Sequence, residues 1–188
     1  MIKEIINSIY KMSIKSIDEV ENLVEYEYRE PGDTFIKKGK RNSKEYFVIE
    51  GICRSYLINP EGEEITIAFF SEKSILSPYV TRTENGFSNL NFQALTKTKI
   101  AGIDALMFEK LMIENLEIRE FGNTVLTNEL TQKVNKEIGL ASLTAKERLI
   151  QFRKQYPLFE NLIPHMAIAT YLGITNISLS RLRKERLP

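Results

Sequence analysis

The chain has 188 residues, of which 43% are hydrophobic and 27% are charged, and its formal net charge is +1. This composition is ordinary for a globular protein and predicts a real core in one large domain or two small ones. No apolar run approaches the ~20 residues that span a bilayer. The first residues, Met1 to Asn7, lack the charged-then-apolar order of a signal peptide. We therefore expect a cytoplasmic protein without a membrane partner.

The chain contains one cysteine, Cys53, and one histidine, His165. One cysteine cannot form an internal disulfide or a cluster for a metal or iron–sulfur site, so we expect a small buried side chain in a strand. One histidine argues against a metal-binding barrel and against a Ser/His/Asp set in the strand region. No phosphate-binding loop of the GxxxxGK type is present. We therefore expect no enzyme, no catalytic residue and no metal ligand.

The net charge hides an asymmetry between the two ends of the chain. Residues 144–188 hold eight Lys/Arg and three Glu, a net charge of +5, whereas residues 1–143 hold 18 Lys/Arg and 22 Asp/Glu, a net charge of −4. A polyanion would be attracted to the C-terminal quarter and repelled by the remainder.

The N-terminal segment has a helical pattern. Ile5, Ile6, Ile9 and Tyr10 recur at helical spacing, and Ser16 is expected to cap a second helix that has acidic residues in its first turn. From about residue 24 to residue 104 the pattern changes to short apolar runs separated by turns. The clearest runs are 46–49, 52–58, 64–70 and 100–103, with turns at 31–33, 50–51 and 59–62. This spacing predicts a small antiparallel barrel or roll.

Helical periodicity returns after Asp104, which is expected to cap a helix over residues 105–113. Residues 116–143 then contain no proline and form an apolar stripe at three- and four-residue steps. The stripe consists of Phe121, Val125, Leu126, Leu130, Val134, Ile138 and Ala141. One narrow stripe on a long helix predicts pairing with a second copy, a homodimer. The alternative is that the stripe packs on the barrel of its own chain, and Gly122 and Gly139 weaken the case for a straight helix.

Thr144 and Glu147 form the pattern of a capping box and predict a helix over residues 145–155, which Pro157 ends. The most informative segment follows at residues 168–184. Ile168, Ala169 and Leu172 fall at helical spacing, and Gly173 supplies a turn.

The second helix of this segment is expected to be capped by Thr175 or Asn176 and to bury Leu179 and Leu182. Its outer face would then carry Asn176, Ile177, Ser178, Ser180, Arg181 and Lys184. This pattern favours a DNA-binding helix-turn-helix, and two ordinary helices joined by a glycine are the alternative.

This order of parts resembles the Crp/Fnr family of bacterial transcription regulators, whose sensor half is a cyclic-nucleotide-binding β-roll. The resemblance is carried by Gly32-Asp33, by 47–51, by 54–56, by 62–64 and by the segment from Ala169 to Lys184. Residues 175–184, Thr-x-x-Ser-Leu-Ser-Arg-Leu-Arg-Lys, are similar to a short-tailed branch. The resemblance implies an α+β fold with a β-roll sensor domain and flanking helices over 1–113, a dimerisation helix over 114–143 and a DNA-binding domain over 144–188.

The resemblance also implies roles at a DNA site. The second helix would enter the major groove, where Arg181 would read guanine, Asn176 adenine and Ile177 a thymine methyl group. Ser178, Ser180, Lys184 and the start of the first helix near His165 would lie at phosphates, and the capping residue Thr175 belongs to the same DNA-binding set. The implied partners are double-stranded DNA, a second copy of the chain and RNA polymerase. The family usually has a β-hairpin wing after this helix, and the sequence stops at Pro188, so either the wing is absent or the sequence is truncated.

Family members that bind cyclic AMP hold it with a Gly-Glu pair and with an Arg followed by Ser or Thr. The matching positions here are Ser77-Pro78 and Ser88-Asn89, and Arg82 is assigned to the loop between them. Without an arginine at the second position, cyclic AMP is not expected to bind in the usual way. A pocket for an unknown effector would involve Ile75, Leu76, Ser77, Tyr79, Ser88 and Asn89. One Cys and one distant His exclude a cysteine cluster and haem held by the sensor domain. Two alternatives stay open, a regulator that needs no ligand and an adaptor that has lost DNA binding and acts through protein contacts.

Overall fold

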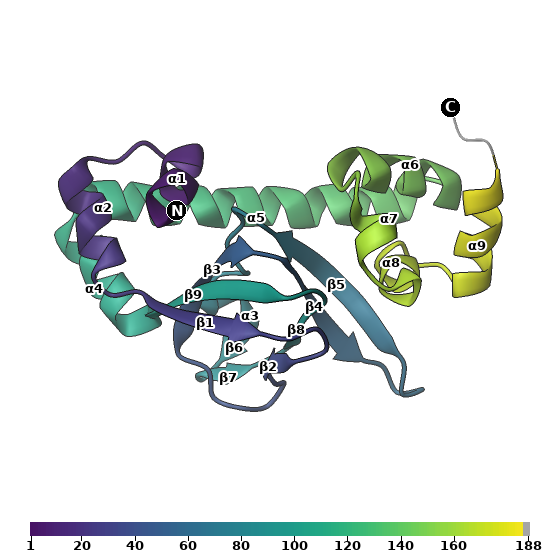
Figure 1. Cartoon of the computed structure of the whole chain (residues 1–188), viewed down its shortest axis with the longest axis horizontal. Helices are drawn as coiled ribbons and strands as arrows, with labels where there is room; N and C mark the ends of the chain where they lie inside the picture. Colours follow the sequence, from purple (N-terminus) through teal and green to yellow (C-terminus); the bar gives the residue numbers. More distant parts are fainter. Residues whose placement is uncertain (186–188) are drawn as a thin grey trace.

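The computed structural model describes residues 1–185, so Arg186 of the basic run lies outside the described part. The fold is mixed α/β, with antiparallel strands in the N-terminal two thirds and helices at the C-terminal end. One long helix runs from the N-terminal helices to the C-terminal ones, alongside the strands (Figure 1). Within the described residues, none of the helices has the length and apolar content that crossing a bilayer requires.

The strands form three antiparallel sheets, in the orders β1-β9-β3, β2-β8-β4-β5 and β6-β7. Their bounds are β1 Glu25–Arg29, β2 Thr34–Ile36, β3 Lys44–Glu50, β4 Ile52–Ile58, β5 Glu64–Ser71, β6 Thr83–Glu84, β7 Phe87–Ser88, β8 Asn91–Ala94 and β9 Thr98–Asp104. The predicted turn at residues 59–62 joins β4 to β5, and the backbone N–H of Asn59 donates to Glu63 O at 3.0 Å. The predicted antiparallel strand region is confirmed.

Nine helices are present among the described residues. They are α1 Ile2–Ile9, α2 Ile14–Glu21, α3 Tyr79–Arg82, α4 Ala105–Glu114, α5 Leu116–Ser142, α6 Ala145–Gln155, α7 Phe159–Leu162, α8 His165–Tyr171 and α9 Asn176–Lys184. Asp104 caps α4, and Thr144 and Glu147 form the capping box of α6, as predicted. The predicted cap at Ser16 is wrong. Ser13 caps α2, and Ser16 lies inside the helix, where its hydroxyl donates to Glu117 of α5.

The core has three parts. One fills the interior of the roll around Phe92, and a second packs α1 and α2 against the outer face of β3 and against α5. The third joins the sheet to the C-terminal helices. Cys53 of β4 is 0% exposed, and burial raises the pKa of its thiol to about 12, which confirms the predicted buried strand residue.

Gly51 makes the tight turn between β3 and β4. Its φ is +88°, and a Cβ at this position would lie 2.3 Å from Lys97 O. Only glycine therefore fits both the backbone conformation and the close approach of the neighbouring chain.

Helix α5 has two apolar faces rather than the single predicted stripe. Phe121 is 1% exposed and packs with Phe47 of β3, whereas Leu130 is 64% exposed. Each residue of an α-helix turns through about 100°, so Leu130, nine residues after Phe121, lies about 180° around the helix axis from it. By Leu130 the stripe has moved from the face that contacts the chain's own roll to the opposite side. We call the exposed side, which carries Leu130, Val134 and Ile138, the free face of α5.

Candidate nucleic-acid interface

The last two helices, α8 and α9, pack as a pair around a tight turn. Ile168, Ala169 and Leu179 are fully buried between them and the rest of the C-terminal core. Gly173 has a φ of +67°, and the N–H of Ile174 donates to Ala169 O at 3.0 Å. The predicted inward residues and the predicted glycine turn are therefore confirmed.

Thr175 is the residue that caps α9. Its hydroxyl accepts a hydrogen bond from the backbone N–H of Ser178 at 3.1 Å, and the two hydroxyls lie 3.0 Å apart. Thr175 or Asn176 was predicted as the cap. Asn176 is instead the first residue of the helix, and its side chain is exposed. Ser178 is half-buried and takes part in the cap, so less of its side chain is open to a ligand than the sequence predicted.

Helix α9 lies at the end of the molecule, away from the strands (Figure 1). Ile177 is 67% exposed, and Ser180, Arg181 and Lys184 are exposed as well. Within residues 1–185, neither Arg181 nor Lys184 forms an ion pair with a carboxylate. This face combines two free cations, an amide, a hydroxyl and an apolar side chain on one rigid helix.

Arg183, on the same helix, is held by its own chain. Its Nε lies 3.0 Å from Glu160 Oε1, and its Nη1 lies 3.1 Å from His165 Nδ1. Partial burial disfavours the charge of Glu160, but hydrogen bonds and charges from Arg153 and Arg183 keep the pKa of its carboxyl below the usual range. His165 Nε2 lies 3.0 Å from Glu160 O, so both ring nitrogens are engaged. Arg183 and His165 therefore brace α8 and α9 against α7.

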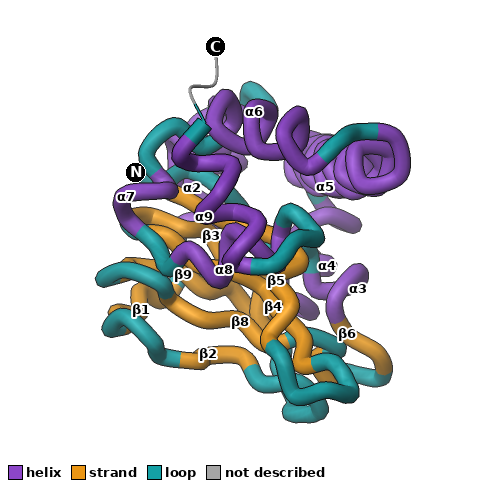
Figure 2. Tube along the Cα trace, turned by 90° about the vertical axis from the view of Figure 1, so that its right-hand side faces the viewer, coloured by secondary structure: helices purple, strands orange, loops and turns teal. Residues whose placement is uncertain are grey.

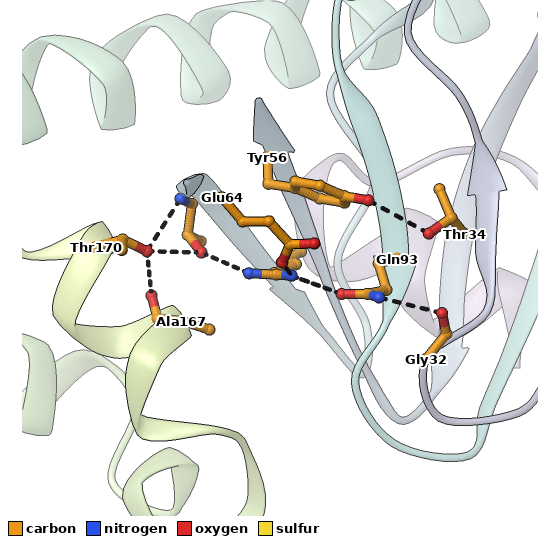
Figure 3. Close-up of polar contacts among 9 residues, drawn as sticks. Gly32, Thr34, Tyr56, Glu64, Gln93, Ala167 and Thr170 are labelled. Carbon is orange, nitrogen blue, oxygen red and sulfur yellow. Dashed lines mark hydrogen bonds and ion pairs between the residues drawn. The ribbon is translucent and has the colours of Figure 1, made fainter. Parts of the chain in front are cut away.

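A chain of hydrogen bonds connects α8 to the sheet (Figure 3). The backbone N–H of Thr66 in β5 donates to Thr170 Oγ1 at 3.2 Å. The guanidinium of Arg54 donates to Thr66 Oγ1 at 3.3 Å, pairs with Glu64, and donates to Gln93 Oε1 at 2.7 and 2.9 Å. Polar contacts thus run without interruption from β8 through β4 and β5 to the first helix of the pair.

An aromatic cluster surrounds this junction. The ring centroid of Phe69 in β5 lies 5.0 Å from Tyr171, 5.6 Å from Phe159 and 6.0 Å from both Phe152 and Tyr156. Seen from the end where the C-terminal helices lie, α5 and α6 run above the strands and α8 lies against them (Figure 2). Sequence reasoning missed this docking. The available signals were the aromatic pair at the end of β5 and the aromatic residues of 152–171.

The residues that the sequence predicted around a ligand are instead bonded to, or packed against, other parts of the protein. The Ser77 hydroxyl donates to Glu129 Oε1 of α5 at 2.7 Å, and the Ser88 hydroxyl donates to Leu90 O at 2.7 Å. Leu76 is fully buried in the roll core, and Asn89 is exposed. The structure therefore does not bring the six predicted pocket residues together around one cavity.

Two of those residues, Ile75 and Tyr79, line a cavity of about 300 Å³ outside the roll. This cavity lies between β3, α4 and α5, and its wall is mostly apolar. The carboxylate of Glu45 is its main polar group, and both oxygens accept from the backbone N–H of Tyr79.

Arg82 does not lie in a loop, as the sequence had indicated. It ends the short helix α3, it is 1% exposed, and its guanidinium enters the roll. Its Nε donates to Ser77 O at 2.9 Å and its Nη1 to Asn42 Oδ1 at 2.6 Å, and its Nη2 donates to Lys44 O. The rings of Tyr46, Tyr79 and Phe92 lie 5.7–5.8 Å from its Cζ. The guanidinium of Arg82 thus fills the polar part of the roll interior.

Residues 26–115 match the family model described as "Cyclic nucleotide-binding domain". Among solved structures, FixK2 from Bradyrhizobium japonicum is similar, with a TM-score of 0.72, 20% identity, and coverage of 85% of this chain and 82% of that one. The c-di-GMP-responsive global regulator CLP from Xanthomonas campestris has a TM-score of 0.72 at 13% identity, with 92% of this chain and 90% of that chain covered.

A transcriptional regulator of the Crp/Fnr family from Eubacterium rectale has a TM-score of 0.71 at 14% identity, with 91% of this chain and 82% of that chain covered. No curated protein matches the sequence. Residues 26–115 are therefore similar to a cyclic nucleotide-binding domain, and the chain shares its fold with these solved transcriptional regulators.

Proposed function

We propose that the protein is a sequence-specific DNA-binding transcriptional regulator in the cytoplasm, not an enzyme, and that α8 and α9 form its helix-turn-helix. The observation that carries this proposal is the outer face of α9, where Arg181 and Lys184 are exposed and unpaired by any carboxylate of residues 1–185. A helix presented in this way fits the major groove, and its cations can neutralise phosphates. The shared fold with Crp/Fnr regulators supports it.

Within this proposal the exposed residues of α9 contact the bases and phosphates of DNA. Arg181 reads guanine through two parallel hydrogen bonds, Asn176 pairs with adenine, and Ile177 contacts a thymine methyl group. Ser180 and Lys184 contact phosphates, with Thr175 and Ser178 at the start of the helix. His165 contributes through the orientation of α8, because its ring is already bound to Glu160 and Arg183.

The regulator acts as a homodimer whose subunits pair along the free face of α5, formed by Leu130, Val134 and Ile138. A contiguous row of exposed apolar residues at helical spacing is typical of a helix that pairs with a partner. The chain then divides into a sensor roll over 1–113, a dimerisation helix over 114–143 and a DNA-binding unit over 144–188. RNA polymerase is a further partner within this proposal.

The sensor roll does not hold a cyclic nucleotide through the usual phosphate site. Arg82 supports this, because a ligand in the roll would have to displace a guanidinium that already has three hydrogen-bond acceptors. Ser77 and Ser88 are likewise committed to Glu129 and to Leu90 O. A roll filled by its own side chains also fits a regulator that needs no ligand. Calorimetric titration with cyclic AMP and cyclic GMP tests this, and micromolar phosphate-dependent binding would overturn it.

Fluorescence anisotropy with the DNA upstream of the protein's own gene tests the main proposal. Arg181→Ala is expected to cost about 1–3 kcal/mol on the specific site and little on random DNA. Lys184→Ala is expected to weaken binding to all sequences alike and to lower the salt slope by about 1. Binding that does not depend on salt, or that both variants leave unchanged, would favour the adaptor alternative.

A further inference from the structure

A second cleft lies at the joint between the roll and the C-terminal helices. It has a volume of about 590 Å³ and is separate from the roll interior and from the apolar cavity beside α4. Its floor is residues 67–70 of β5, one wall is the face of α5 from Glu129 to Leu140, and the other is α6 with Tyr171 of α8. The cleft therefore borders the sheet, the long helix α5 and the C-terminal helices α6 and α8 together.

Two cations line the cleft without an anionic partner. The Lys136 amine donates to Ile67 O at 2.5 Å and lies 4.1 Å from the centroid of the Tyr171 ring. The Arg148 guanidinium donates to Leu172 O at 2.9 Å and to Leu143 O at 2.6 Å. Both cations are thus bound to neutral acceptors, and neither forms an ion pair within residues 1–185.

The acids on the cleft wall do not compensate these two charges. Glu129 pairs with Lys133 at 3.1 Å and accepts from Ser77, and Glu137 has no ion pair in the described part of the chain. Burial, together with the charge of Lys133, lowers the pKa of Lys136 to about 8. A cation in this state lacks the solvation of water and the attraction of a counter-ion, so an anion that enters the cleft stabilises it.

We propose that this cleft binds a small organic anion, a phosphorylated or carboxylated metabolite, whose charged group lies against Lys136 and Arg148. The volume exceeds that of a bare phosphate or carboxylate, and the side-chain amides of Gln132, Gln151 and Gln155 line the remaining wall. Such a wall offers hydrogen bonds to the uncharged part of a ligand, as in most small-molecule sites.

A second copy of the chain would not cover this cleft. Lys136 and Gln132 lie on the side of α5 that faces β5, whereas the free face with Leu130 and Val134 is on the opposite side of the helix. The anion site therefore stays open in the proposed dimer. Because the cleft borders β5, α5 and α8 together, an anion bound there would favour one position of α8 relative to the roll.

Calorimetric titration of the full chain with phenyl phosphate, without DNA and at constant ionic strength balanced with sodium chloride, tests the proposal. Wild-type protein is expected to bind one equivalent saturably. Lys136→Met keeps the length of the stem and removes the charge, and is expected to weaken binding roughly tenfold or more. Lys136→Gln removes the same charge in case the methionine variant does not fold, and Lys136→Arg is expected to retain binding.

Lys15→Met is the matched control, because it removes the same charge from an exposed position of α2, away from the cleft. Retained binding in this control together with a loss in Lys136→Met supports the cleft. If Lys136→Met binds as tightly as the wild type, the anion lies elsewhere and the proposal is overturned. An absence of saturable binding to the wild type overturns it as well. None of these readouts requires DNA, so they are independent of the proposed regulator function.

Discussion

The backbone N–H of Thr66 donates to the hydroxyl of Thr170 over 3.2 Å, and this bond ties a buried residue of the edge strand β5 to α8. Thr170 also donates to Ala167 O and lies 3.3 Å from the Thr66 hydroxyl, so one side chain serves both elements. The position of α8, and with it that of α9, is therefore set partly by the sheet.

Thr170→Val is expected to lower the free energy of unfolding by about 1–2 kcal/mol, because it leaves a half-buried N–H without an acceptor. Thr170→Ser keeps the hydroxyl and is the control, with a smaller effect. Urea unfolding followed by circular dichroism measures both. Equal stability of the valine variant and the wild type would mean that water replaces the hydroxyl at this junction.

Arg183 and Arg181 lie two residues apart on α9 and are expected to behave differently. Arg183→Ala removes the contacts to Glu160 and His165 and should lower stability by about 1 kcal/mol. Arg181→Ala removes an exposed side chain with no partner in residues 1–185 and should leave the melting temperature unchanged. Thermal melts compare the two variants. A loss of stability in Arg181→Ala alone would contradict the assignment of Arg183 as the bracing residue.

Leu130→Lys is expected to convert the proposed dimer to monomers. A lysine on the free face of α5 would meet its symmetric copy in an apolar contact, at a cost of about 2 kcal/mol or more. Asn128→Lys, an exposed position of the same helix away from that face, is the control. Sedimentation velocity reads out the mass. A dimer that survives Leu130→Lys would show that the subunits pair elsewhere.

The stability of the chain should depend on pH through Lys136. Its pKa falls from 10.5 to about 8 on folding, mainly through burial. Between these values the unfolded chain holds a proton that the folded chain lacks, so stability rises as the pH is raised. The gain amounts to up to about 3 kcal/mol across the full interval.

Lys136→Met has no charge to bury at any pH. It is therefore expected to be more stable than the wild type at about pH 7, and the difference in stability is expected to shrink towards about pH 10. Urea titrations of both proteins at several pH values measure it. A difference that does not change with pH would mean that Lys136 keeps its ordinary pKa in the folded chain.

Gly51→Ala should destabilise the roll by about 3 kcal/mol or more, since a Cβ must fit 2.3 Å from Lys97 O at a φ of +88°. Gly62→Ala is the control, because its φ is +84° but no atom lies within 4 Å of the added Cβ. The control should cost only the backbone strain, about 1–2 kcal/mol. If the two variants unfold at the same urea concentration, the strand connection at residue 51 must be able to move.

Local signals in the sequence predicted local structure well. The caps at Asp104 and Thr144 and the turn at Gly173 depend on a few neighbouring residues, and the structure has all three. The predicted cap at Ser16 was wrong, because the contact of this serine depends on Glu117, about one hundred residues away in the sequence, which accepts from the hydroxyls of both Ser13 and Ser16.

Long-range partners also explain what the sequence could not show. The burial of Arg82 depends on acceptors at residues 42, 44 and 77, which the folding of the roll brings together. The docking of the C-terminal helices on Phe69 involves rings more than eighty residues away in the sequence. The exposed face of α9 was predictable because the placement of its side chains needs only the helix that carries them.

The sealed position of Cys53 has a practical consequence. The only thiol in the chain is fully covered by the roll core, and a thiol must ionise before it can be alkylated. Alkylation can therefore proceed only during moments when the roll opens. Without any engineered label, the rate of modification would report how often the two sheets separate, and mass spectrometry could follow it in the natural chain.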